Sequence, residues 1–313
     1  MKCLVTGATG FVGAHLVRWL IQHECQVAVL IRPTSNLWRL QDIVLQLHII
    51  SGNLFEIALS APAIQRFAPE IVFHLGWSAA RTKYRDAPVQ IQNLCGSLNL
   101  LQTARDAGCL CWIGLGSQAE YGRSESIITE DSPTHPETLY GITKLSTALL
   151  AQKMCNLFGV RFAWLRLFAV YGPMDDPDYL IPYVIRVLLD SGKPSLTSGE
   201  QQWDYLFVQD AVRAIGQIGM TPTVHGIFNL GSGQAVPVKR IVEHLRERID
   251  SRLQLGFGDK AYDANQTMLL QADVSRLQKA IGWIPQVSLE DGLEQTINWY
   301  RDRRKEDRSD ESR

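Results

Sequence analysis

Tyr140 and Lys144 stand four residues apart in a segment, 140–158, that we expect to be helical. Residues at this spacing share one face of a helix. A free tyrosine has a pKa of about 10, and a lysine ammonium beside the phenol favours the phenolate and lowers that pKa. We therefore predict that Tyr140 exchanges a proton with an alcohol or carbonyl oxygen while Lys144 tunes its pKa. An ordinary aromatic residue near a helix N-terminus is the alternative.

A serine belongs with this pair. Ser117 follows the apolar strand expected over 110–115, one element before the helix of Tyr140. In a doubly wound sheet the carboxyl ends of the strands face the ligand crevice. We predict that the Ser117 hydroxyl binds the same substrate oxygen, so that the three residues together carry out carbonyl–alcohol chemistry.

A glycine-rich turn near the N-terminus predicts a bound dinucleotide. It lies between a strand expected over 3–5 and a helix expected over 11–23, which is the context that gives such a motif its meaning. The helix N-terminus offers free N–H groups and a positive dipole end to a pyrophosphate. A structural turn without a ligand is the alternative. The expected cofactor contacts are Gly7, Thr9, Gly10, Phe11 and Val12.

Arg32 decides the expected type of dinucleotide. It follows the second strand, 27–31, where an NAD site usually carries a carboxylate for the ribose hydroxyls. A carboxylate repels a 2′-phosphate, whereas a guanidinium binds one through charge-assisted hydrogen bonds. We therefore predict NADP(H) as the cofactor, with Ser35 and Asn36 as further donors. A solvated surface arginine is the alternative.

These residues need a sheet to bring them together. Short strands that are apolar on both faces alternate with helical stretches, which is typical of a parallel sheet covered by helices. The predicted fold class is α/β, a doubly wound parallel sheet (Rossmann) with a smaller C-terminal substrate-binding lobe. The expected strands are 3–5, 27–31, 47–50, 71–75, 110–115 and 160–167, and the expected helices are 11–23, 88–107 and 140–158.

Past Gly172 the prolines cluster and the rhythm becomes irregular, which indicates the smaller lobe. Late strands are expected over 205–208 and 227–230, and helices over 238–249 and 289–301. We expect the Rossmann domain to comprise 1–174 with 204–231, and the lobe to comprise 175–203 and 232–300. The charged tail, 301–313, is expected to be disordered.

Composition excludes several functional classes. The formal net charge of −1 gives no global field toward nucleic acid, and no apolar run approaches the ~20 residues that span a bilayer. The six cysteines contain no CxxC pair, which favours buried thiols in a reducing compartment. We expect a cytoplasmic protein with no metal site and with neither a nucleic-acid nor a membrane partner.

The ordered motifs resemble the extended short-chain dehydrogenase/reductase family of the NAD-dependent epimerase/dehydratase type, and within it the chain resembles the nucleotide-sugar 4-ketoreductases. The resemblance runs nearly end to end and implies a nucleotide-sugar substrate. It also implies a homodimer through the helices 88–107 and 140–158, unless their apolar residues face only the sheet. Besides the glycine turn, Ser117 and the Tyr140–Lys144 pair, the motifs are 73–76, Asn93, 165–173, 204–212, 228–233 and 277–285.

The resemblance further implies which residues contact each ligand. Substrate contacts are expected from Trp77, Gln118, Ala119 and Trp203, where Trp203 either stacks on a base or sugar or packs in the lobe. Ala169, Trp203 and Asp263 replace residues with which the family often contacts phosphate, which leaves the nucleotide open. Cofactor contacts beyond the turn and Arg32 are expected from Asn53, Leu54, Leu75, Gly76, Trp77, Phe168, Tyr140 and Lys144.

Gln118 and Ala119 separate the reactions that the family carries out. Sugar-nucleotide 4,6-dehydratases usually place an acidic pair or Ser-Glu there, and alanine transfers no proton. The ending 119–122 is similar to that of reductases of 4-keto-6-deoxy sugars. We therefore expect NADPH-dependent reduction of a nucleotide-activated 4-keto-6-deoxyhexose. The alternatives are a nucleotide-sugar 4-epimerase with a retained cofactor, a reductase of a small non-nucleotide ketone, and a non-catalytic cofactor sensor.

Overall fold

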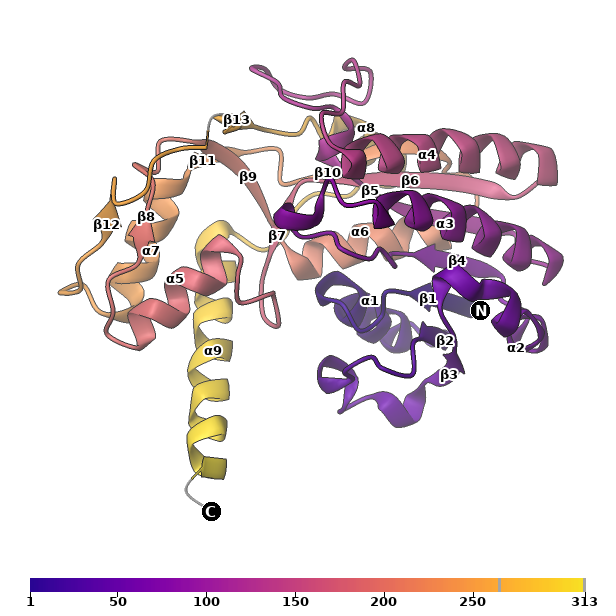
Figure 1. Cartoon of the computed structure of the whole chain (residues 1–313), viewed down its shortest axis with the longest axis horizontal. Coiled ribbons are helices and arrows are strands. Elements are labelled where there is room, and N and C mark those ends of the chain that lie inside the picture. Colours follow the sequence, from indigo (N-terminus) through magenta and orange to yellow (C-terminus); the bar gives the residue numbers. More distant parts are fainter. Residues whose placement is uncertain (264–265, 312–313) are drawn as a thin grey trace.

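Seven short strands form the central sheet of the computed structural model, which describes residues 1–263 and 266–311 (Figure 1). Every neighbouring pair in this sheet is parallel, and the strand order is β10-β6-β5-β4-β1-β2-β3. The predicted doubly wound α/β class is confirmed. The strands are β1 (Lys2–Thr6), β2 (Gln26–Ile31), β3 (His48–Ser51), β4 (Ile71–His74), β5 (Cys111–Ser117), β6 (Arg161–Leu167) and β10 (Gly226–Leu230).

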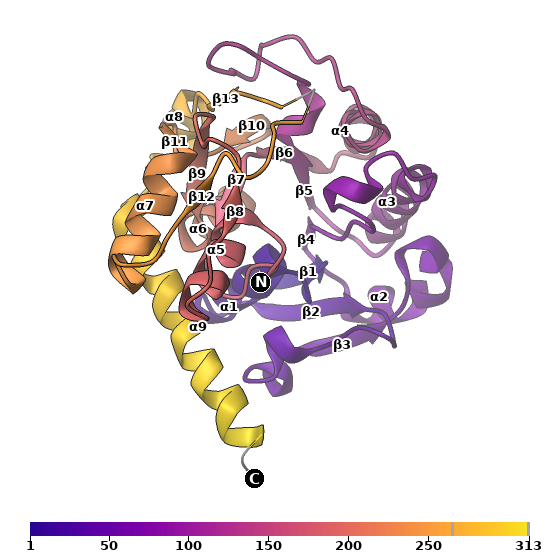
Figure 2. The ribbon, with the colours of Figure 1, turned by 60° about the vertical axis from the view of Figure 1, so that its left-hand side comes forward.

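Helices cover both faces of this sheet, which is why its strands are apolar throughout. The helices α1 (Phe11–Gln22) and α6 (Val208–Met220) pack on one face around residues such as Val29 and Ile113. The other face carries α2 (Ala61–Phe67), α3 (Val89–Asp106) and α4 (Leu139–Phe158). Figure 2 shows the two helical layers on opposite sides of β4 and β5. Short 3₁₀ segments lie between these elements: η1 (Trp38–Leu40), η2 (Val44–Gln46), η3 (Leu54–Ser60), η4 (Thr82–Tyr84) and η5 (Gln118–Glu120).

The strand order reverses at β1, which has β2 on one side and β4 on the other. Ligands of open α/β sheets bind at such a switch point, outside the carboxyl ends of the strands. Gly7 follows β1 at this point with a φ of +73°, and an added Cβ atom would lie 2.7 Å from the backbone nitrogen of Gly76. Only glycine allows the turn after β1 to approach the segment after β4 this closely.

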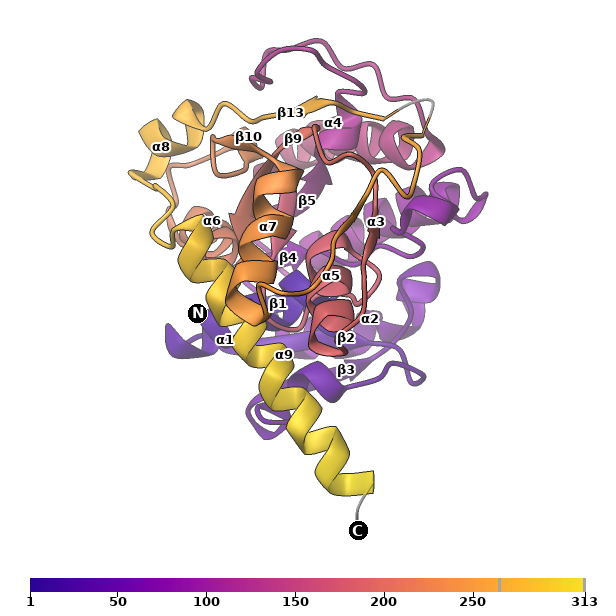
Figure 3. The ribbon, with the colours of Figure 1, turned by 90° about the vertical axis from the view of Figure 1, so that its left-hand side faces the viewer.

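The smaller lobe has its own core. Its helices α5 (Leu180–Leu189), α7 (Val238–Ile249) and α9 (Leu289–Glu311) pack together around residues such as Val184, Val242 and Ile297. Figure 3 shows these three helices on the face of the lobe. The remaining elements of this part of the chain are β7 (Ala169–Tyr171), β8 (Ser195–Leu196), β9 (Gln202–Phe207), β11 (Ala235–Pro237), β12 (Gly256–Phe257), β13 (Leu269–Leu270) and α8 (Ser275–Ile281).

Helix α9 continues through residues 301–311, within the charged segment 301–313 for which disorder was expected. The helix is held by its charged side chains. Arg301 donates to the Arg248 carbonyl at 2.7 Å, and Arg304 forms an ion pair with Asp190. Residues 312–313 lie outside the described residues.

Two side chains fasten the start of the lobe to the glycine turn. A ring nitrogen of His15 lies 2.9 Å from the Pro173 carbonyl oxygen. Arg39 donates to the Met174 carbonyl at 2.8 Å and to the Thr9 carbonyl at 3.3 Å. The segment after β7 is therefore held against the cofactor end of the sheet.

Among the described helices, none has the length and hydropathy needed to cross a membrane.

Candidate active site

The turn after β5 is a capping box. The Ser117 hydroxyl accepts a hydrogen bond from the Ala119 backbone N–H at 3.2 Å. Glu120 accepts one from the Ser117 N–H at 2.9 Å, so the donors at the start of η5 are satisfied reciprocally. The arrangement fixes Ser117 at the carboxyl end of its strand.

Glu120 is fully buried and joins this turn to β6. Its Oε2 atom accepts from the Arg166 Nε at 2.7 Å, and its Oε1 atom accepts from the Trp164 Nε1 at 2.9 Å. This ion pair was not predicted from the sequence. Two signals were present, namely the Ser-x-x-Glu spacing of a capping box and an arginine inside an apolar strand, which requires a partner when buried.

The N-terminus of α4 places Tyr140 beside Ser117. The Thr138 hydroxyl caps the helix by accepting from the Gly141 N–H at 3.2 Å. A Cβ atom at position 141 would lie 2.5 Å from the Ala119 carbonyl oxygen, so glycine is needed for α4 to approach η5. Tyr140 is 8% exposed, and its phenol lies next to the Ser117 hydroxyl.

The pKa of Tyr140 differs from the sequence prediction. Burial raises this pKa above its ordinary value, while the Ser117 hydroxyl and the charge of Arg85 act in the opposite direction. The Lys144 ammonium, which was expected to lower this pKa, lies 5.9 Å from the centroid of the Tyr140 ring. Its Nζ atom donates to the Leu115 carbonyl at 2.7 Å and lies 3.8 Å from the centroid of the Trp77 ring.

The pKa of Lys144 is also strongly shifted. Burial lowers its pKa from 10.5 to about 7, although the charge of Glu120 favours the protonated form. The Trp77 ring that covers it also meets Tyr140 edge to face, with 6.1 Å between centroids, and its indole N–H donates to Gln90 at 2.8 Å. Lys144 therefore lies in a dry aromatic environment and can gain or lose a proton near neutrality.

The glycine turn presents the donors that a pyrophosphate requires. Gly10 is the N-cap of α1 and contributes no side-chain cap, and the first turn of the helix contains no acidic residue. The amides at Phe11 and Val12 and the positive end of the helix dipole therefore face no competing anion from this turn. These residues fit a dinucleotide phosphate. Thr9, by contrast, uses its carbonyl to accept from Arg39.

The other expected cofactor contacts lie at the ends of neighbouring strands. Arg32 is exposed directly after β2, and Asn53 caps η3 by accepting from the Phe55 N–H at 3.1 Å. Leu54 packs toward Gly96 of α3. Leu75 and Gly76 bond through their N–H groups to the Thr6 carbonyl and hydroxyl, respectively. Phe168 is 6% exposed and donates to the Leu230 carbonyl.

His74 and Trp203 have structural contacts. His74 lies between Thr6 and Ser97, 2.8 Å from each hydroxyl, and burial lowers its pKa to about 3, so the ring is neutral. Trp203 donates its indole N–H to the Thr267 carbonyl at 2.9 Å and packs near Tyr205. This favours the packing alternative for Trp203. Gln118 and Ala119 form the half-buried start of η5, beside Ser117.

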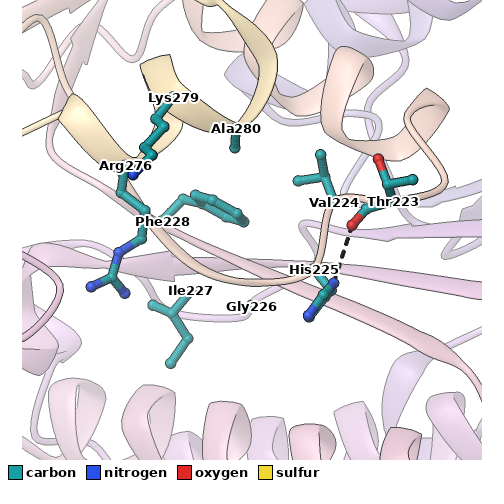
Figure 4. Close-up of a pocket in the computed structure, with 9 residues that line it drawn as sticks. All are labelled: Thr223, Val224, His225, Gly226, Ile227, Phe228, Arg276, Lys279 and Ala280. Carbon is teal, nitrogen blue, oxygen red and sulfur yellow. Dashed lines mark hydrogen bonds between the residues drawn. The ribbon is translucent and has the colours of Figure 1, made fainter.

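A separate pocket of about 380 Å³ lies away from this site (Figure 4). It is lined by the segment 223–228 and by α8 residues such as Arg276 and Lys279. Gly226 begins β10 and pairs with Ala163 in β6, whereas Ser117 pairs with Leu167 at the other end of the same strand. The pocket is therefore at the amino end of the sheet, opposite the catalytic side chains.

The fold and these side chains define a dinucleotide-binding α/β protein with a serine at the carboxyl end of β5 and a tyrosine and lysine on α4 beside it. Residues 3–231 match the NAD dependent epimerase/dehydratase family. The chain belongs to this family, and the resemblance found in the sequence is confirmed.

Known relatives match over nearly their whole length. An uncharacterized UDP-glucose epimerase of Bacillus subtilis, YtcB, is 26% identical, over 95% of this chain and 97% of that protein. The UDP-glucuronate 4-epimerase of Thermodesulfobacterium geofontis is 26% identical, over 96% of each. The crystal structure of UDP-glucose 4-epimerase with UDP-glucose from Thermotoga maritima is 25% identical, with a TM-score of 0.84 over 96% of this chain and 99% of that one.

Replacing Glu120 by glutamine is expected to lower the free energy of unfolding by about 3–5 kcal/mol, because Arg166 is then a buried charge without a counterion. Glu137→Gln is the matched control, since its ion pair with Arg123 is about half exposed. It should cost about 0–1 kcal/mol. Urea denaturation of both variants measures the difference, and equal losses would contradict the role assigned to Glu120.

Proposed function

We propose that the protein is a nucleotide-sugar 4-epimerase that keeps its nicotinamide cofactor between turnovers. The observation that carries this proposal is the buried Tyr140 beside Ser117. Ser117 is followed in its own turn by Gln118 and Ala119, whose side chains transfer no protons. The relatives that match over 96% of this chain include UDP-glucose and UDP-glucuronate 4-epimerases, which supports the same reaction. They favour the epimerase over the 4-ketoreductase that was the leading expectation from the sequence.

Proton transfer and orientation are the work of the protein side chains. A nicotinamide cofactor held at the glycine turn would supply reversible hydride transfer at sugar C4. Tyr140, in its phenolate form, takes the proton from the C4 hydroxyl as the carbonyl forms and gives it back as the alcohol re-forms. Ser117 donates a hydrogen bond to the same oxygen, and Lys144 supplies positive charge when it is protonated. Each cycle balances, because the hydride and proton that leave the sugar both return to it.

Water elimination, the other reaction in the family's name, lacks its acid and base here. Glu120 is the one carboxylate in the segment 117–122, and both its oxygens are occupied by Ser117, Trp164 and Arg166. A carboxylate fixed in this way does not serve as a free proton acceptor at sugar C5 or C6. We therefore propose an epimerase rather than a 4,6-dehydratase.

The second candidate is the NADPH-dependent 4-ketoreductase, with Arg32 as the observation in its favour. Arg32 is exposed at the end of β2, where an NAD site usually has a carboxylate, and a guanidinium there suits a 2′-phosphate. A ketoreductase consumes one NADPH for each sugar, whereas an epimerase consumes none. The cofactor that co-purifies with the protein and its net consumption distinguish the two.

The direct test is interconversion of UDP-glucose with UDP-galactose, and of UDP-glucuronate with UDP-galacturonate, followed by chromatography without added cofactor. The epimerase should turn over at least one pair, and Tyr140→Phe should lower kcat by about 10²–10⁴-fold because the proton carrier is lost. A Tyr205→Phe variant, which changes a buried tyrosine of the lobe core, is the control for folding. Oxidation of NADPH with 4-keto-6-deoxy sugars and no epimerisation would favour the second candidate.

We also propose a homodimer through α3 and α4, which pack side by side (Figure 1). Their outer surface carries large apolar residues whose exposed fractions are high for a monomer: Ile91 at 53%, Leu149 at 56% and Leu157 at 70%. Light scattering after gel filtration should give about twice the chain mass of 35.1 kDa. Leu149→Lys should shift the protein toward the monomer, because it places a charge in the interface. A wild-type monomer at micromolar concentration would contradict the dimer.

A further inference from the structure

Arg85 lies on the loop between β4 and α3, directly beside the proposed proton carrier. Its backbone carbonyl accepts from the Tyr140 N–H at 2.8 Å, and the next residue, Asp86, accepts from the Leu139 N–H at 2.9 Å. The Arg85 guanidinium carbon lies 5.2 Å from the centroid of the Tyr140 ring. The loop therefore fixes a cation against the phenol, in a position that sequence analysis did not identify.

This cation has no anion of its own within the described part of the chain. Its Nε atom is buried without a hydrogen-bond partner, and no ion pair joins Arg85 to another described residue. The neighbouring carboxylates have other partners: Asp86 caps α4, Glu120 pairs with Arg166, and Asp176 and Asp178 both pair with Arg81. A partly buried guanidinium in this state gains free energy when an anion binds it.

We propose that Arg85 binds the C6 carboxylate of a hexuronate, so that the substrate of the site is a nucleotide-activated uronic acid. This rests on the proposed 4-epimerase function, which puts sugar O4 at the Tyr140 hydroxyl. C5, which bears the carboxylate, is bonded to C4, so the carboxylate is next to the reacting oxygen and beside the phenol. The guanidinium fork matches a carboxylate with two parallel hydrogen bonds.

The position of Arg85 fits the sugar carboxylate better than the nucleotide diphosphate. The diphosphate is attached to C1, which lies across the pyranose ring from C4. A cation that serves it belongs at the far end of the sugar, away from the proton carrier. Arg85 instead packs on the ring of Tyr140 itself. A neutral hexose would leave the guanidinium without a counterion.

The experiment compares UDP-glucuronate with UDP-glucose in the wild type, Arg85→Gln, Arg85→Lys and the control Lys83→Gln. Lys83 is an exposed cation on the same loop. The wild type should prefer the uronate. Arg85→Gln should lower the ratio of kcat/KM for uronate to kcat/KM for hexose on the order of 100-fold, mainly through the KM for the uronate, because a charged hydrogen bond is lost. Arg85→Lys should restore part of the ratio, and Lys83→Gln should leave it unchanged.

Three results would overturn the proposal. An equal loss for both sugars in Arg85→Gln would place Arg85 at the diphosphate or at Tyr140 alone, and no loss for either would make it structural. A wild-type protein that prefers the hexose would also exclude the proposed recognition of a carboxylate by Arg85. If the wild type converts neither sugar, the proposed function fails. Calorimetric binding of UDP-glucuronate and UDP-glucose to the wild type and Arg85→Gln then still decides whether Arg85 recognises the carboxylate.

Discussion

The candidate active site depends on one buried ion pair. Glu120 and Arg166 are 0% and 3% exposed, and burying two charges is favourable only if the remaining donors and acceptors are also satisfied. The acceptors of Glu120 are used in this way, because it also accepts from the Ser117 backbone and from Trp164. The pair thus joins the end of β5 to β6 and gives the turn that carries Ser117 a single conformation. Tyr140 is positioned against that same turn through the missing side chain of Gly141.

The same burial sets the electrostatics of the site. A dry environment raises the pKa of the Tyr140 phenol above its ordinary value and lowers that of the Lys144 ammonium to about 7. Lys144 then rests between the Leu115 carbonyl and the Trp77 ring rather than on the tyrosine. The Arg85 guanidinium carbon lies 5.2 Å from the centroid of the phenol ring, and the Lys144 Nζ atom lies 5.9 Å from it. Two basic side chains therefore lie near one proton carrier. Lys144 contacts the Leu115 carbonyl and the Trp77 ring, whereas Arg85 lies against the ring of Tyr140.

The sequence predicted the fold closely because its signals are local. Apolar strands, the glycine turn and the Tyr140–Lys144 spacing each follow from a few adjacent residues. What it did not predict are contacts between distant segments, such as Glu120 with Arg166 and Arg85 with Tyr140. The packing of Trp203 in the lobe could not be predicted either, because it is indicated by a hydrogen bond to Thr267, which is distant in the sequence. The charged composition of 301–313 suggested disorder, whereas Arg301 and Arg304 have partners in Arg248 and Asp190, more than 50 residues away.

The central claim is that hydride leaves and returns to the same sugar. The most direct measurement uses UDP-glucuronate and UDP-glucose labelled with deuterium at C4, incubated with the protein and excess unlabelled NADPH and NADH. A retained cofactor predicts that the epimerised product keeps its deuterium, with no net loss of either reduced cofactor. Loss of deuterium from the product, or stoichiometric oxidation of NADPH, would contradict the account.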